Sequence, residues 1–355
     1  MKKDRNINLD IIRCVAVLTV ICVHFFLHNG YYNVPVLGKK MYIATLMRTA
    51  FMVCVPLFLL LTGYLMNKKN LSKKYYYGII RTLAMYFLST LFILIYRIFL
   101  KNEPISLVYC IKNITSFYQY SWYISMYIGL FMLIPFINLI YNNLRGKKQK
   151  LALIVTMCII TALPSITNTF AFPVVPEWWI NIYPFTYYFL GAYISEYKDD
   201  IKISLKLNFL LIILSVIIFG TYTFIRTQGS NFIYGAWCEW YSFANIITAV
   251  LVFIFLLRIK TDKMPCLIRR IITKISSISL GMYLVSWIFD DCFYPILNAK
   301  IPEMTDRLPY FFVMIPLVFI CSFILSCITD LIYKGINLII KKCFNKHIKS
   351  PAPHS

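Results

Sequence analysis

Long apolar runs bounded by charged residues repeat along the chain, and this pattern constrains the fold more than any other feature. A helix of roughly 18 or more apolar residues is long enough to cross a lipid bilayer. Lipid offers the backbone no hydrogen bonds, so a crossing segment must satisfy its own polar groups. Of the 355 residues, 60% are hydrophobic, well above the share in soluble domains. The sequence therefore predicts an integral membrane protein of the all-α class.

Division of the sequence at these charges predicts a polytopic bundle of about ten transmembrane helices. The sixth predicted span is the least secure, because it is short and contains Pro184. The predicted domains are one membrane domain, residues 1–334, and a short basic tail, residues 335–355, that lies on the inner leaflet. The predicted spans are approximately 9–28, 44–66, 76–100, 121–142, 151–170, 181–197, 207–226, 241–258, 275–295 and 308–333.

The net charge of +22 raises the question of nucleic-acid binding, but the basic residues follow the membrane topology. If the N-terminus is inside, the predicted inner segments hold 25 Lys and Arg residues and the outer loops hold 6. The positive-inside rule then predicts that both termini are cytoplasmic, and an even number of spans agrees. We expect a multi-pass protein of the cell membrane with no nucleic-acid partner. Five arginines within or at the ends of spans need another reason: Arg13, Arg48, Arg81, Arg97 and Arg226.

The first span, residues 9–28, carries Asp10, Arg13, His24 and His28. At about 100° and about 1.5 Å per residue, His24 lies about 20° around the helix from Arg13 and about 16 Å farther along it. Asp10 lies on the same side of the helix, so the three residues form one narrow stripe. Charged groups at membrane depth face protein or water, and this stripe must do the same.

Each of the four polar residues has a structural interpretation and a functional one. Asp10 has the spacing for an ion pair with Arg13 that braces the inner helix end, whereas Arg13 itself lies deeper and suits an anion from the cytoplasm. His24 is either a hydrogen-bonded core histidine or a catalytic group, and ionisable groups at this depth favour the latter. His24 and His28 have metal-ligand spacing, but the sequence offers no third ligand. We therefore predict no metal, and interpret His28 as an interfacial bystander.

These residues resemble a known family, the integral-membrane acyltransferase-3 proteins. "RNINLDIIRCVAVLTVICVHF", in which ten residues separate Arg13 from His24, resembles the start of that family. "FMVCVPLFLLLTGYLMNKK" is similar to its second span, and "SWYISMYIGLFMLIPFI" to its Trp-aromatic motif followed by a proline. "YYFLGAYI" and "SISLGMYLVSW" are weaker matches in the expected order. The chain departs from the family pattern at Gly78, where an Arg-x-x-Arg motif has its first arginine, and at Ser286, where a histidine is frequent.

The resemblance implies a membrane acyltransferase domain over residues 1–334 that moves an acyl group, expected to be acetyl, from cytoplasmic acyl-CoA to a hydroxyl of a cell-envelope glycan or exopolysaccharide. Acetyl-CoA would be a donor substrate, and no cofactor would stay bound. The implied partners are the lipid bilayer, acyl-CoA, the glycan acceptor and a glycan-assembly protein. His24 would act as the base that deprotonates the acceptor hydroxyl, or would carry the acyl group briefly.

Basic residues at the predicted inner face are candidates for the phosphates of CoA. Arg13 and Arg81 are the stronger ones, because they lie within spans and a guanidinium binds phosphate with fixed bidentate geometry. Lys73 and Lys74 are also candidates, but ordinary positive-inside topology explains these two lysines better than CoA binding does.

Four further residues are candidates for the acceptor path. Tyr64 and Trp122 line this path or act as interfacial anchors. Glu177 and Asp290, with Asp291, hold sugar hydroxyls or are solvated charges near the outer face.

Two other classes of function compete with acyl transfer. A ten-span bundle with an internal polar stripe could export or flip a polysaccharide, or move a small solute. Transporters of this kind show repeat symmetry or paired broken helices, and neither is visible in the sequence. A purely structural membrane protein would leave the stripe from Arg13 to His24 without a purpose.

Overall fold

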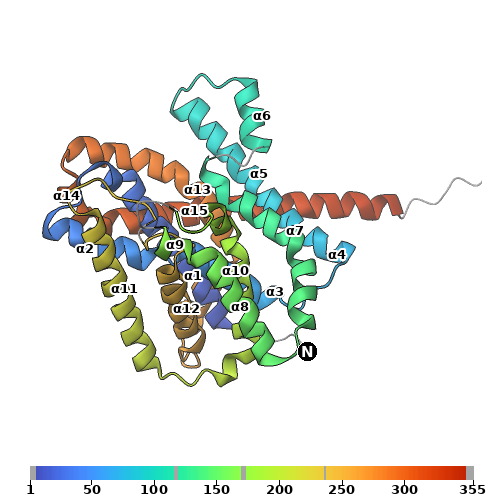
Figure 1. Ribbon diagram of the computed structural model, residues 1–355. Coiled ribbons are helices and arrows are strands. Elements are labelled where there is room, and N and C mark those ends of the chain that lie inside the picture. The colour runs from blue at the N-terminus through green and yellow to red at the C-terminus, as the bar shows by residue number, and fades with distance from the viewer. Residues whose placement is uncertain (1–4, 116–118, 169–172, 236, 349–355) are drawn as a thin grey trace, which may run out of the picture.

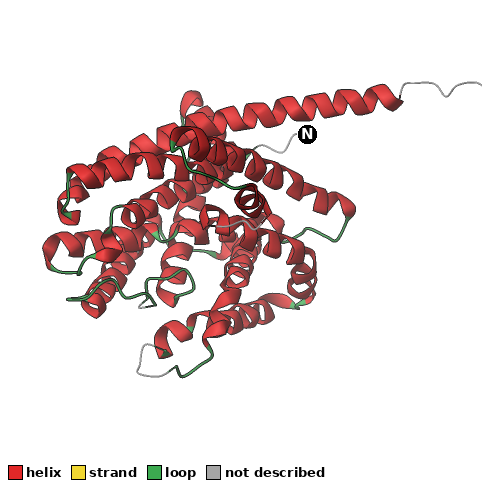
Figure 2. Cartoon of the chain, turned by 90° about the horizontal axis from the view of Figure 1, so that it is seen from above, coloured by secondary structure: helices red, strands yellow, loops and turns green. Residues whose placement is uncertain are grey.

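The computed structural model describes residues 5–115, 119–168, 173–235 and 237–348, and their regular structure is helical throughout (Figures 1 and 2). The α-helices are α1 (Ile7–His28), α2 (Gly38–Phe51), α3 (Cys54–Met66), α4 (Lys73–Tyr76), α5 (Ile80–Ile95), α6 (Leu107–Thr115), α7 (Trp122–Asn143), α8 (Gly146–Ala162), α9 (Pro164–Thr167), α10 (Tyr183–Tyr197), α11 (Leu205–Thr227), α12 (Phe243–Arg258), α13 (Cys266–Lys300), α14 (Met304–Arg307) and α15 (Phe311–Ile348).

The predicted spans correspond to helices of the bundle. In the described part of the chain, 8 helical segments are long and apolar enough to cross a membrane. The predicted sixth and eighth spans form shorter helices, α10 with 15 residues and α12 with 16. The prediction of an all-α polytopic bundle is confirmed, while the cytoplasmic position of the termini stays a prediction. We call the two ends of the bundle the Arg13 end and the His28 end, after residues near the start and end of α1.

The second predicted span is broken between α2 and α3, at Met52 and Val53. Pro56 explains the break, because its ring cannot donate a hydrogen bond and clashes with the carbonyl four residues earlier. That carbonyl belongs to Met52, and the buried Asn245 side chain on α12 donates to it at 3.0 Å. A polar group exposed by the break is thereby satisfied without water, as a membrane interior requires.

At two other prolines inside helices, the carbonyl that the proline leaves without its helical donor also accepts from a distant side chain. Pro135 in α7 and Pro295 in α13 each free the carbonyl four residues earlier. The donors are the Tyr75 hydroxyl to Phe131 O at 2.6 Å and the Lys101 ammonium to Asp291 O at 3.5 Å. The carbonyls freed by these prolines are therefore satisfied by side chains that are distant in the sequence.

Helices α3 and α10 approach each other more closely than any side chain would permit. A Cβ atom added at Gly63 would lie 1.9 Å from Tyr188 O, and one added at Gly191 would lie 2.0 Å from Leu60 O. Small residues that allow backbones to touch are a common basis of helix association in membranes. This packing explains why α10, although short, is an integral part of the bundle.

Replacing Gly63 by alanine is expected to destabilise the fold by at least about 1–3 kcal/mol, because backbone atoms of α10 must move to admit the methyl group. The measurement is the midpoint of thermal unfolding in detergent. Gly129→Ala is the matched control, since a Cβ there meets nothing within 4 Å in helix α7. Equal midpoints for the two variants would contradict the close contact between α3 and α10.

The last helix continues beyond the predicted end of the membrane domain. Helix α15 runs unbroken to Ile348 and projects past the other helices (Figure 1). Residues 335–348 of the predicted tail therefore extend the last span as the same helix, and the apolar side chains of Leu338 and Ile339 are exposed there. The position of this segment on the inner leaflet stays a prediction.

Candidate active site

Helices α1 and α13 lie side by side and run in the same direction. The Ser276 hydroxyl donates to Asp10 Oδ1 at 2.6 Å, and His24 Nδ1 lies 2.8 Å from Asp290 Oδ2. Asp10 and His24 are 14 residues apart, as are Ser276 and Asp290, so the two helices keep one register over this length. The sequence does not predict this pairing, because α1 and α13 are far apart in the chain.

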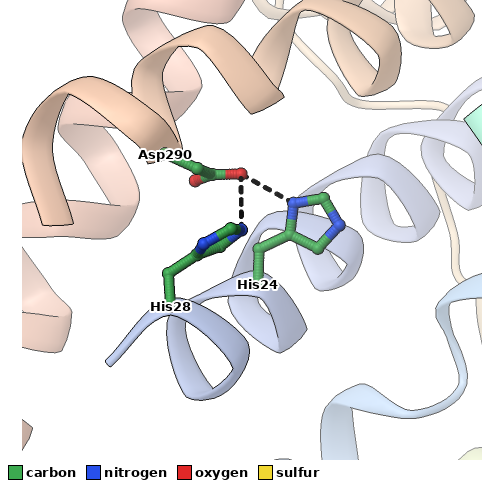
Figure 3. Close-up of side chains that lie close together, drawn as sticks. All are labelled: His24, His28 and Asp290. Atoms are coloured by element: carbon green, nitrogen blue, oxygen red, sulfur yellow. Dashed lines mark hydrogen bonds and ion pairs between the residues drawn. The ribbon is translucent and has the colours of Figure 1, made fainter. Parts of the chain in front are cut away.

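The hydrogen bond between His24 and Asp290 is the central interaction of the site (Figure 3). The side chain of Asp290 has no exposed area, whereas that of His24 is 21% exposed. With Nδ1 donating its proton to the carboxylate, the Nε2 of a neutral imidazole is left as an acceptor. This arrangement orients a histidine as a base in many enzymes. The expectation that Asp290 is a solvated charge is wrong, because α13 continues past it and buries it against α1.

His28 approaches the same carboxylate from one turn farther along α1. Its Nε2 lies 3.8 Å from Asp290 Oδ2, too far for a hydrogen bond, and its ring stacks on Tyr294 with centroids 5.6 Å apart. Asn298 also donates to the His28 carbonyl at 2.9 Å. His28 is thus packed inside the bundle next to the site, and its interpretation as a bystander stays a prediction.

The fold brings Asp290 next to His24 and His28, so a third possible metal ligand is present that the sequence pattern did not indicate. The ligand atoms of His24, His28 and Asp290 lie within 4.8 Å of one another, which is a possible metal-binding group. Both histidines, however, approach one oxygen atom, Asp290 Oδ2, and the shorter distance is that of a hydrogen bond. The geometry fits a histidine held by a carboxylate, and the absence of a metal stays a prediction.

The inner part of the predicted stripe also forms a network. The Asp10 carboxylate accepts from Arg5 at 2.6 and 2.8 Å and from Ser276. Arg13 contacts Asp10 and Ser276 only at 3.4 Å, both through Nη1. In the described part of the chain its Nε and Nη2 atoms have no hydrogen-bond acceptor, and its side chain is 30% exposed. The shortest contacts of Asp10 are thus with Arg5 and Ser276 rather than with the expected partner Arg13, and among the described residues most donors of Arg13 have no acceptor.

One cavity of about 450 Å³ connects the two ends of the stripe. Arg13 and Ser276 line it near the Arg13 end, and His24 lines it toward the His28 end. Between them its wall is mainly apolar and aromatic. The aromatic lining residues from α7 and α13 are Trp122, Tyr123, Tyr127 and Tyr283. The stripe therefore faces an internal space rather than lipid.

The other predicted donor-site residues lie at the Arg13 end in different settings. Arg81 donates to Ser277 O at 3.1 Å and pairs with Asp330 at 3.4 Å, and Ser277 itself lines the cavity. Lys73 and Lys74 are exposed on α4, and neither contributes to the lining of the cavity in the described residues. Arg81 is thus at the rim of the cavity, and the two lysines are farther out.

The predicted acceptor-path residues are separated by the fold. Trp122 lines the cavity and stacks on Trp240 with centroids 4.7 Å apart. Tyr64 instead lines a separate hollow with Asn6, the residue that caps the start of α1, so it lies at the Arg13 end. Its expected place on the acceptor path is wrong, because the second span runs toward that end. Glu177 is an exposed residue at the start of a short 3-10 helix and does not line the cavity.

Two charged residues of the cavity wall were not among the predicted site residues. Arg48 and Glu239 line the cavity and form an ion pair at 3.5 Å. The signal for Arg48 was its position inside an apolar span, whereas Glu239 lies next to the start of a span and showed no signal.

Comparison with known protein families matches residues 6–327 to the acyltransferase domain of the acyltransferase-3 family. Searches of curated proteins and of solved structures gave no match. The matched region includes the His24–Asp290 pair, Arg13 and the cavity between them. The chain belongs to the acyltransferase-3 family and is a membrane acyltransferase.

Proposed function

We propose that this protein transfers an acyl group, with acetyl as the first candidate, from cytoplasmic acyl-CoA to a hydroxyl of a cell-envelope glycan. The observation that carries the proposal is the single cavity that reaches from Arg13 to the Asp290-bound His24. A donor that enters at the Arg13 end and an acceptor that enters at the His28 end would meet at the imidazole. The proposed location is the plasma membrane, with the Arg13 end in the cytoplasm.

The Arg13 end suits the phosphates of CoA. Arg13 offers a guanidinium with free donors inside the cavity, and bidentate binding of phosphate is a property of this group. Near the rim, three cations surround the carboxylate of Asp330: Arg81, Lys274 and Lys334, at 3.4, 3.2 and 2.8 Å. Because only one of the three charges is neutralised by this carboxylate, the group keeps an excess of positive charge. The extended pantetheine arm would span the about 16 Å from Arg13 to His24.

The chemical step is the attack of an acceptor hydroxyl on the thioester carbonyl. His24 Nε2 takes the hydroxyl proton as the new C–O bond forms, and the C–S bond breaks. The imidazolium then returns this proton to the thiolate of CoA. Asp290 holds the ring through Nδ1 and stabilises its positive charge during the step. The apolar and aromatic wall around His24 limits the access of water, which would otherwise hydrolyse the thioester.

The function is tested with purified protein in detergent, acetyl-CoA labelled in the acetyl group and oligosaccharides released from a bacterial envelope. We expect labelled, base-labile esters on the sugar and one free CoA per ester, also in the presence of EDTA. Absence of acetyl-CoA binding would contradict the proposal and favour a glycan or solute exporter. Loss of transfer with EDTA, restored by zinc, would show instead that His24, His28 and Asp290 hold a metal.

Replacing Arg13 by alanine is expected to raise KM for acetyl-CoA by about 10- to 100-fold, because phosphate loses a charged hydrogen-bond donor. The expected effect on kcat is smaller, since His24 and Asp290 keep their geometry. Steady-state kinetics at varied acetyl-CoA measure this difference. Lys74→Ala is the control, because that lysine is exposed and away from the cavity lining. A larger rise in KM for Lys74→Ala than for Arg13→Ala would move the donor site out of the cavity.

A further inference from the structure

The cavity wall near the His28 end carries an ion pair that the proposed chemistry does not use. Arg48 on α2 is 2% exposed, and its Nη2 lies 3.5 Å from Glu239 Oε1. Glu239 belongs to the loop between α11 and α12. Both residues line the cavity that also contains His24. A buried charge is costly unless it is paired and hydrogen-bonded, so this pair requires an explanation.

Arg48 is fixed on several sides. Its Nε donates to the Tyr32 hydroxyl at 2.8 Å, and its Nη1 donates to Cys238 O at 3.2 Å. The guanidinium carbon lies 4.3 Å from the centroid of the Phe232 ring, a distance for a cation–π interaction. These contacts hold the guanidinium in one orientation but leave N–H groups on its Nη atoms available, since a guanidinium has five donors.

Glu239 has an open acceptor. Its Oε1 receives the Arg48 contact and the Cys238 thiol at 3.4 Å. Within the described residues its Oε2 has no hydrogen-bond donor, and its side chain is 17% exposed. A carboxylate oxygen that lines a cavity without a donor is suited to accept from hydroxyl groups of a ligand.

The loop that carries Glu239 has a strained backbone. Trp237 has φ of 59°, in the left-handed region that bulky side chains rarely adopt. Its ring stacks on Tyr222 with centroids 3.7 Å apart, which anchors it on α11 away from the cavity. Strain of this kind persists where surrounding contacts enforce it, and it is concentrated at functional sites. Here it accompanies the presentation of Glu239 to the cavity and of Cys238 O to Arg48.

An aromatic ring completes this part of the wall. Tyr234 lines the cavity, is 59% exposed and stacks on Tyr32 with centroids 5.5 Å apart and planes 17° apart. Tyr32 is the residue that accepts from Arg48. The wall therefore combines a flat ring face, a fixed guanidinium and an open carboxylate oxygen, all within the cavity of His24.

We propose that Arg48, Glu239 and Tyr234 form the subsite for the acceptor, and that the acceptor presents an uncharged sugar ring there. Neighbouring hydroxyls of a pyranose would donate to Glu239 Oε2 and accept from Arg48, while the C–H face of the ring would lie on Tyr234. The charges of Arg48 and Glu239 cancel, which disfavours a uronate or phosphate at this position. This inference rests on the proposed function, because it assigns the acceptor side of the same cavity.

The test uses the full chain, labelled acetyl-CoA and two acceptors with the same type of pyranose ring. One is the neutral methyl β-glucopyranoside, and the other is the anionic glucuronate. We expect the neutral glucoside to be acetylated with the lower KM. Glu239→Gln should raise the KM for the glucoside by about tenfold, because the charged acceptor of the sugar hydroxyl is replaced by a neutral and weaker one. Tyr234→Ala should raise it by about fivefold, whereas Tyr234→Phe should not change it, since the ring face is kept. KM for acetyl-CoA should be unchanged in all three variants.

Three results would overturn the subsite. They are an unchanged glucoside KM in Glu239→Gln, a preference of the wild type for glucuronate, and no acetylation of either sugar while acetyl-CoA is still bound and slowly hydrolysed. Glu239→Gln leaves the buried Arg48 without its charged partner, so its KM is measured on protein with the elution profile and thermal midpoint of the wild type. Tyr234 is exposed, so the Tyr234 variants test the subsite independently of folding. Absence of acetyl-CoA binding by the wild type would be a different result, since it contradicts the proposed function itself.

Discussion

Replacing His24 by alanine is expected to slow acyl transfer by about 10³-fold, with little change in KM for acetyl-CoA. The loss has the size of general base catalysis by a positioned side chain, and the donor contacts of Arg13 are unaffected because they lie at the other end of the cavity. The measurement is the rate of labelled ester formation at saturating acetyl-CoA. It is made with the variant purified to the same elution profile as the wild type.

His28→Ala is the matched control for this variant. It removes an imidazole one turn away on the same helix, and one that makes no hydrogen bond to Asp290. We expect less than about a tenfold change in kcat, through a small shift of the Asp290 side chain. Full transfer by His24→Ala would contradict the catalytic assignment. Equal losses in both variants would favour a unit in which the two histidines act together.

The second large effect is expected for Asp290→Asn, with kcat lower by about 10³-fold and KM values nearly unchanged. The amide keeps the volume of the carboxylate but loses the charge that selects the tautomer of His24 and stabilises its protonated form. Thermal stability should be unchanged or higher, because Asp290 is fully buried and its Oδ1 has no hydrogen-bond partner among the described residues. A fall in kcat without a fall in stability separates a positioning role from a merely structural one.

Asp291→Asn is the neighbouring control. Asp291 is 29% exposed and contacts Lys101 at 2.9 Å and the Tyr96 hydroxyl at 2.8 Å, away from His24. Its replacement should leave kcat within about threefold of the wild type. If Asp290→Asn lowered stability and activity together, and Asp291→Asn did the same, the carboxylates would be structural rather than catalytic.

The positions of the helices along the chain could be predicted, because membrane spans leave a strong local signal. The predicted 9–28 span is α1, Ile7–His28, and even the uncertain 181–197 span is α10. The helical period also placed Arg13 and His24 on one side of α1, and both line the same cavity. These features depend on neighbouring residues in the chain, where composition and periodicity are informative.

The partner of His24 could not be predicted in the same way. Asp290 is 266 residues away, and the contact depends on α1 and α13 being parallel neighbours in one register. An aspartate next to a second aspartate near a predicted span end has the pattern of solvated charges. A count of spans predicts that the first and the ninth run in the same direction, but it does not predict that they touch.

Tyr64 and Glu239 also show that one sequence does not predict which side chains line the cavity. Tyr64 was expected on the acceptor path and lies elsewhere, whereas Glu239 was not expected and lines the cavity. Tyr64 is part of a motif that resembles the family, but the direction of its span places it at the Arg13 end. Glu239 follows no motif and lies in a loop, yet the strained turn at Trp237 accompanies its position on the cavity wall. Packing between distant segments decides which loop side chains face the cavity, and a single sequence indicates little about such packing.

Transfer of the acyl group through the cavity can be measured in vesicles with donor and acceptor on opposite sides. Acetyl-CoA labelled in the acetyl group is added outside, and a mixture of neutral and anionic methyl glycosides is enclosed within. We expect labelled sugar esters inside the vesicles while all CoA stays outside, and no esters with His24→Ala. Esters formed only when donor and acceptor share one side, or CoA appearing inside, would contradict transfer through the cavity between Arg13 and His24.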